Sequence, residues 1–136
     1  MLFRSALIDK AYDVALDFFM RPDAEKRRYD GTHTNGQRGF TSFGTEHAKN
    51  SKAPDLKEFW HVGQELAPGD ALRKVYPDNI WPEGMPVFKD TYLKLFKQLE
   101  TCALSVLEAC ALHINEPKDR FAGMAQGGNT ILRVIH

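Results

Sequence analysis

Histidine and acidic side chains are the residues of this sequence that could bind a metal ion, and one pair has a useful spacing. His113 and Glu116 lie three positions apart at the end of an apolar stretch. On a helix this spacing brings both side chains onto one face, where they could supply two ligands. The other interpretation is a histidine at a helix C-terminus, where the helix dipole favours a positive charge. Because two ligands are a weak signal, we expect the second interpretation.

A glycine cluster at residues 123–128 has the pattern Gly-x-x-x-Gly-Gly. A phosphate-binding loop would need a strand before it, a helix after it and a following Lys-Ser/Thr pair. None of these is present, so the cluster predicts a turn.

Two cysteines, Cys102 and Cys110, could act as nucleophiles or form a disulfide. They are eight positions apart in a segment that is predicted to be helical, which places their Cα atoms about 12 Å apart. That separation excludes a disulfide between them, and no charged neighbour is evident to stabilise a thiolate. We expect both to be buried core thiols, in keeping with a reducing cytoplasmic location.

Composition excludes several classes of partner. The 136 residues carry 18 basic and 18 acidic side chains, so there is no basic field for nucleic acid. No run approaches the ~18 apolar residues of a membrane-spanning helix. A hydrophobic content of 43% fits one ordered domain. From the balanced charge and the lack of a long apolar run, we expect this domain to bind neither nucleic acid nor membrane.

Two amphipathic helices are predicted to position these residues. Apolar side chains recur every three or four positions in residues 5–20 and again in residues 88–113. The second half of the longer segment is apolar nearly all round, so we expect that end to be buried on most sides.

The remaining segments predict an α+β fold with shorter helices and a few short strands. Short helices are expected at 21–29 and 118–124, and strands at 38–44, in the second half of 55–62, and at 130–136. Residues 64–86 hold four of the seven prolines and are expected to be an extended connection. A final strand needs a partner for its backbone groups, so we expect the sheet to continue outside this chain.

Several segments, in order along the chain, resemble one enzyme family. They are Leu-Ile-Asp-Lys-Ala-Tyr-Asp (7–13), Pro22 to Lys26, Arg-Gly-Phe-Thr-Ser-Phe-Gly (38–44), Pro-Asp-Leu-Lys-Glu-Phe-Trp-His-Val-Gly (54–63), Asn-Ile-Trp-Pro (79–82) and Leu-Arg-Val-Ile-His (132–136). Together they resemble the N-terminal region of isopenicillin N synthase-like non-haem iron(II), 2-oxoglutarate-dependent oxygenases.

This resemblance implies a helix-rich region, with one long central helix, that supports a double-stranded β-helix barrel lying beyond this chain. In the family, two histidines and a carboxylate of the barrel hold iron(II), and an Arg-x-Ser pair binds 2-oxoglutarate. None of the five histidines is followed two positions on by Asp or Glu, and no arginine begins Arg-x-Ser. We therefore expect residues 1–136 to form a single region that ends before the catalytic barrel. Iron(II) and 2-oxoglutarate would serve the whole enzyme, and this chain alone would contain no catalytic or metal residue, bind neither cofactor and be inactive.

The same resemblance implies that Gln37, Thr41 and Arg133 face a small-molecule substrate. Gln37 and Thr41 could instead be plain loop and strand residues, and Arg133 an ordinary strand arginine that faces solvent.

A second function remains open from the sequence alone. The chain could be a stand-alone, non-catalytic, α-rich binding or scaffold protein. Such a protein should bury its long helix and pair its last strand internally. An excerpt of an oxygenase should instead leave an exposed apolar patch, which could also drive self-association.

Overall fold

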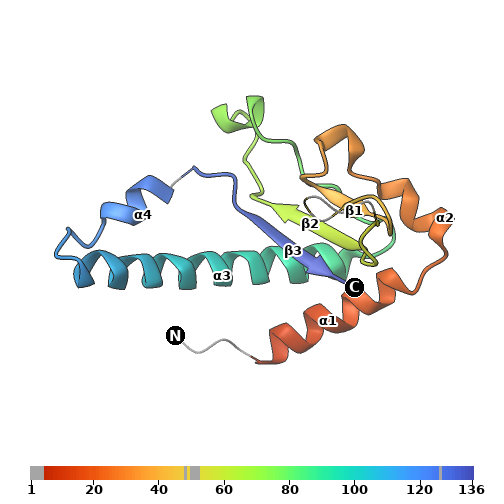
Figure 1. Cartoon of the computed structure of the whole chain (residues 1–136), viewed down its shortest axis with the longest axis horizontal. Coiled ribbons are helices and arrows are strands. Elements are labelled where there is room, and N and C mark those ends of the chain that lie inside the picture. Colours follow the sequence, from red (N-terminus) through yellow and green to blue (C-terminus); the bar gives the residue numbers. More distant parts are fainter. Residues whose placement is uncertain (1–4, 48, 50–52, 126) are drawn as a thin grey trace.

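A three-stranded antiparallel sheet with two helices packed on one of its faces forms the centre of the molecule (Figure 1). The structure, a computed structural model, describes residues 5–47, 49, 53–125 and 127–136. The α-helices are α1 (Ser5–Phe19), α2 (Asp23–Lys26), α3 (Pro86–His113) and α4 (Arg120–Ala125). The strands are β1 (Gly39–Thr41), β2 (Phe59–Gly63) and β3 (Ile131–Ile135), and 3-10 turns occupy Arg27–Tyr29, Thr32–Thr34 and Ala71–Lys74.

The sheet has the order β1-β2-β3, so the central strand lies between the earliest and the latest strands of the chain. Phe40 pairs with Trp60 across β1 and β2, and Trp60 pairs with Val134 across β2 and β3. Because paired residues point to the same side of a sheet, these three side chains share one face. That face packs against α1 and α3.

Aromatic side chains dominate the core between the sheet and the helices. Phe18 of α1 is fully buried, and its ring makes edge contacts with Phe40 at 5.7 Å and with Trp60 at 4.8 Å between centroids. Phe88 of α3 contacts Trp60 in the same way at 5.2 Å. Edge-to-face packing at these distances adds to the stabilisation that burial of the rings provides. Phe18 therefore joins the first helix to the sheet.

A buried ion pair holds α2 against the sheet. Lys26 Nζ lies 2.7 Å from Glu58 Oε2, and both residues are almost fully buried. Lys26 also donates to the Phe19 carbonyl at 3.1 Å, and Glu58 Oε1 lies 3.0 Å from His136 Nδ1. Burial lowers the pKa of Lys26, but its bonds with Glu58 and with Asp23 outweigh burial and raise that pKa overall. The Glu58 carboxylate, just before β2, thus joins Lys26 of α2 to His136 just after β3, and the Lys26 ammonium also holds the end of α1.

Most of the predicted elements are confirmed, with ends that differ by a few residues. One prediction is wrong in part, since residues 64–86 are not wholly extended. They contain a 3-10 turn at Ala71–Lys74, which Asp70 caps by accepting a hydrogen bond from the Leu72 N–H at 2.9 Å. The prolines of this segment lie outside that turn.

The expected burial of the second half of α3 is wrong for this chain. The sheet and α1 cover the part of α3 that carries Phe88, Tyr92 and Phe96, and α3 then extends beyond them toward α4 (Figure 1). Val106 is 57% exposed and Leu112 is 58% exposed.

The two cysteines lie on this second half of α3. Both cysteines are free, as predicted, but the expected core location is wrong because Cys110 is exposed and Cys102 only half-buried. None of the helices among the described residues could span a membrane.

Candidate functional site

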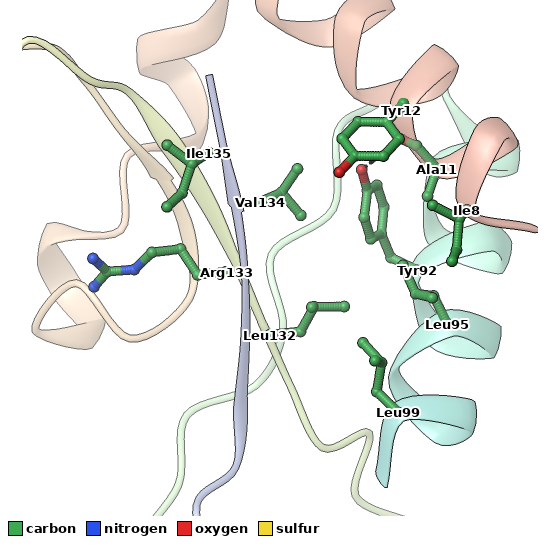
Figure 2. A pocket seen from close by; sticks show the side chains of 10 residues that line it. All are labelled: Ile8, Ala11, Tyr12, Tyr92, Leu95, Leu99, Leu132, Arg133, Val134 and Ile135. Atoms are coloured by element: carbon green, nitrogen blue, oxygen red, sulfur yellow. Dashed lines mark hydrogen bonds between the residues drawn. The ribbon is translucent and has the colours of Figure 1, made fainter. Parts of the chain in front are cut away.

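The face of the sheet that points away from the helices carries most of the polar side chains of interest. Alternation along β2 places Trp60 and Val62 toward the core, and Phe59, His61 and Gly63 on the opposite face. Thr41 pairs with Phe59 and Arg133 with His61, so both join that second face. Figure 2 shows the same alternation in β3, where Leu132 and Val134 point toward α1 and α3 while Arg133 points away. We call this second surface the outer face.

Arg133 is held on the outer face by two neighbours in β2. Its Nε donates to His61 Nε2 at 2.6 Å, and its guanidinium carbon lies 4.3 Å from the centre of the Phe59 ring. The two terminal nitrogens, Nη1 and Nη2, face the Glu46 carboxylate at 3.4 and 3.5 Å. The guanidinium is therefore fixed in orientation while its forked end faces an anion.

His61 is arranged to stay neutral. Its Nδ1 lies 2.6 Å from the Gly36 carbonyl oxygen and must carry the proton that this bond requires, which leaves Nε2 to accept from Arg133. Burial lowers the pKa of His61, and the charges of Arg133 and Arg38 lower it further. The Gly36 bond and Glu46 act in the opposite direction without reversing the shift. His61 therefore orients Arg133 without adding charge.

Arg38 contributes a second, buried guanidinium at the other end of β2. It is 1% exposed, and it donates to the Gln37 carbonyl at 2.8 Å and to Asn129 Oδ1 at 3.0 Å. Its Nε has no hydrogen-bond partner, and no carboxylate of the described residues lies within ion-pair distance of it. A Cβ on Gly63 would lie 2.0 Å from Arg38 Cζ, so only glycine leaves room for the guanidinium. Burial lowers the pKa of Arg38.

The three residues that the family resemblance implied for the substrate pocket differ from one another in how accessible they are. Arg133 lies on the outer face with its charged end accessible. Thr41 is on the same face but only 8% exposed, so little of it is available for contact. Gln37 lies just before β1 and uses its side-chain oxygen to accept from Asn129 Nδ2 at 2.7 Å.

One comparison, over the N-terminal part of the chain, identifies the family to which the chain belongs. Residues 3–84 match the family model described as the non-haem dioxygenase in morphine synthesis N-terminal region. This match covers more than half of the chain. The chain belongs to the non-haem dioxygenase N-terminal family.

Curated relatives of this dioxygenase N-terminal region are similar to it in sequence over most of its length. A 2-oxoglutarate-Fe(II) type oxidoreductase, hxnY of Emericella nidulans, is 25% identical over 93% of this chain and 38% of its own. The 2-oxoglutarate-dependent dioxygenase ecdK of Aspergillus rugulosus is 31% identical over 74% of this chain and 33% of its own. The dioxygenase N-terminal region thus spans well under half of the length of these relatives.

This chain also spans less than half of the length of similar proteins whose structures are solved. A protein assigned to the 2OG-Fe(II) oxygenase family from Caulobacter crescentus is 39% identical, with a TM-score of 0.89 over 99% of this chain and 44% of its own. A Neurospora crassa protein solved in complex with alpha-KG and thymine has a TM-score of 0.79 over 99% of this chain at 23% identity, which shows a shared fold.

A metal site is not formed by the described residues of this dioxygenase N-terminal region. Among them, no three His, Cys, Asp or Glu side chains gather closely enough to hold a metal ion. His113 is the last residue of α3 and Glu116 lies beyond it, so the helical spacing expected for this weak pair is not realised.

The partners of Arg133 were not predicted from the amino-acid sequence. No role in the site was predicted for His61, yet its side chain is buried and accepts a hydrogen bond from Arg133. Strict alternation in residues 59–63 was the available signal, because it places His61 on the face opposite Trp60. Glu46 could not be identified, since a loop position carries no such period.

Proposed function

We propose that the protein containing this chain is an iron(II)- and 2-oxoglutarate-dependent dioxygenase that oxidises a small organic substrate. The observation that supports this most strongly is the match of 99% of the chain to the Caulobacter crescentus protein at 39% identity and a TM-score of 0.89. Iron(II) with 2-oxoglutarate supplies oxygen activation in such an enzyme, and the residues for it would come from outside this chain. The residues described above would bind and orient the substrate.

In this proposal the outer face forms one wall of the substrate pocket. Arg133 is the residue that can contact substrate, because its charged end is accessible and its orientation is fixed by His61 and Phe59. Gln37 and Arg38 would act less directly, by holding Asn129 and the start of β3 in place.

We further propose that a catalytic barrel covers the exposed apolar side of α3. Val106, Leu112 and Ile114 are each more than half exposed, and an apolar hollow beside them is lined by Cys102, Val106, Cys110 and Ile114. Burial of such a surface is favourable at roughly 25 cal/mol per Å² of apolar area. In the absence of a barrel the same surface would favour self-association of the chain.

The test compares the intact gene product with residues 1–136. With iron(II) and 2-oxoglutarate, the intact protein should form succinate, and a matched Arg133→Ala variant should need a higher substrate concentration for half-maximal rate. Residues 1–136 alone should form no succinate above a metal-free control. Succinate formation by residues 1–136 alone would contradict the proposal that the catalytic residues lie outside this chain. Absence of succinate formation by the intact protein would contradict the proposed dioxygenase activity.

A further inference from the structure

Glu46 faces the forked end of Arg133 in the way that a carboxylate ligand would. Its two oxygens are matched one to one with the two terminal nitrogens of Arg133. Yet the distances of 3.4 and 3.5 Å are longer than the roughly 2.7–2.9 Å of a strong charge-assisted bond. The pairing has the geometry of bidentate recognition without its full strength.

The contacts of Glu46 show where it could move. Lys57 Nζ lies 3.3 Å from Glu46 Oε2 and also 2.7 Å from Asp55 Oδ2. Glu46 therefore has a second cation beside it, which could keep it paired after it leaves Arg133. Arg133, by contrast, is anchored through Nε and the Phe59 ring and would stay in place.

The charges around the outer face favour an incoming anion. Arg133, Arg38 and Lys57 are cationic, Glu46 and Asp55 are anionic, and His61 is held neutral. Arg38 is the uncompensated charge, because it is buried and no carboxylate of the described residues pairs with it. An unpaired buried charge is costly, and an anion brought near it reduces that cost.

We propose that the substrate bound at the outer face carries a carboxylate, which displaces Glu46 and binds the forked end of Arg133. This inference rests on the proposed function, in which the outer face is a wall of the substrate pocket. Glu46 then acts as a placeholder that keeps Arg133 paired while the pocket is empty. The chemistry that recognises the ligand is a planar, bidentate anion beside an aromatic ring.

The experiment titrates the chain with benzoate and with benzamide, its uncharged counterpart, near pH 7. The Nε–H signal of Arg133 in proton–nitrogen NMR spectra reports on binding. Benzoate should shift this signal saturably, with a dissociation constant on the order of millimolar, as expected for a small fragment. Benzamide should produce little shift. A shift of equal size with benzamide, or none with benzoate at concentrations up to about 50 mM, would overturn the proposal.

Two variants separate displacement from simple attraction. Glu46→Gln removes the competing charge and should tighten benzoate binding by about two- to fivefold, the amount that a half-exposed ion pair can contribute. Glu108→Gln is the matched control, because Glu108 of α3 is similarly exposed but pairs with Lys118 beyond the end of that helix, and it should leave the affinity unchanged. Unchanged affinity in Glu46→Gln would contradict the placeholder role.

Arg133→Lys keeps the charge but loses the fork, so it should abolish most of the benzoate binding seen through saturation transfer to the benzoate ring protons. A far-ultraviolet circular dichroism spectrum that matches the unsubstituted chain would show that this variant is folded. Full binding by a folded Arg133→Lys would exclude bidentate recognition. Because this titration needs no turnover, it can succeed while the succinate assay fails, and the two proposals are tested separately.

Discussion

Arg133 Nε donates to His61 Nε2 at 2.6 Å, and the two residues are directly paired across β3 and β2. A charged guanidinium can make this bond only if the imidazole nitrogen has a free lone pair. The bond therefore links the orientation of Arg133 to the protonation state of His61, and so to pH.

Stability should fall on acidification because of His61. Its pKa in the folded chain is below the ordinary value of about 6.5, so the unfolded state binds the proton more readily. The contribution of His61 is present above about pH 6.5 and is lost as the pH falls below that value toward its folded pKa. Urea unfolding at pH 7.5 and pH 5.5 should show a larger loss for the unsubstituted chain than for His61→Gln. Equal losses in both would mean that other groups cause the pH dependence.

The buried pair of Lys26 and Glu58 should be sensitive to removal of one partner. Glu58→Gln leaves a buried ammonium with only the exposed Asp23 carboxylate as an ionic partner and should lower the free energy of unfolding by about 3–5 kcal/mol. The double variant Lys26→Met with Glu58→Met removes both charges and should be less destabilised than Glu58→Gln. Chemical denaturation measures both, and a double variant as unstable as the single one would show that packing, not charge, is responsible.

Gly63 should not accept a side chain while Arg38 is present. Gly63→Ala places a methyl group 2.0 Å from Arg38 Cζ, and we expect a loss of about 1–3 kcal/mol in stability from overpacking. The loss from Gly63→Ala should shrink in an Arg38→Ala background, where the guanidinium is gone. Gly123→Ala is the control, since nothing lies within 4 Å of the new methyl group on α4, and it should be neutral or slightly stabilising. A Gly63→Ala variant that loses no more stability than Gly123→Ala would contradict the position of Arg38.

Phe18 should be the most costly residue to truncate in α1. Phe18→Ala removes the ring that joins α1 to the sheet and should cost about 3–5 kcal/mol. Tyr12→Ala on the same helix is the control, because Tyr12 is 71% exposed and should change stability by no more than about 0.5 kcal/mol. Thermal unfolding followed by circular dichroism would distinguish them, and comparable losses would refute the central position of Phe18.

Cys110 should react with a maleimide faster than Cys102 in residues 1–136. Cys110 is exposed and Cys102 half-buried, so the difference follows from access. Mass spectrometry of time points, with Cys110→Ser as the reference for Cys102 alone, gives both rates. In the intact protein the proposed barrel should slow Cys110. Slow reaction of Cys110 in residues 1–136 would indicate that self-association already covers α3.

Much of the fold could be predicted because periodicity reports burial on one side of an element. The helical period placed α1 and α3, and clusters of β-branched and aromatic residues placed β2 and β3. The period fails for the second half of α3, where an apolar sequence is left exposed in this chain. An apolar surface shows that burial is favourable, but it does not show that the partner lies within these 136 residues.

The candidate site was harder to predict because it depends on pairing across the sheet. Arg133 was proposed only through a family resemblance, and Glu46 lies in a loop with no period. The contact between Arg133 and His61 arises from the register that places these two residues opposite each other across β2 and β3. Alternation within a strand gives the face of each residue, but β2 and β3 are joined by a long connection and not by a tight turn that would fix their register.

The order of strands in the sheet also constrains how the chain can fold during its synthesis. The ribosome synthesises the central strand β2 early, but it synthesises the partner strand β3 only after the whole of α3. Phe59 therefore cannot pair with Ile135 until both segments have been made. Until the ribosome has passed that point, one edge of β2 has no β3 to pair with, and Trp60 and Val62 lack part of their cover. Pairings so distant along a chain form slowly and leave strand edges open to other chains. Chaperones that shield nascent chains would therefore be needed most while α3 is being translated.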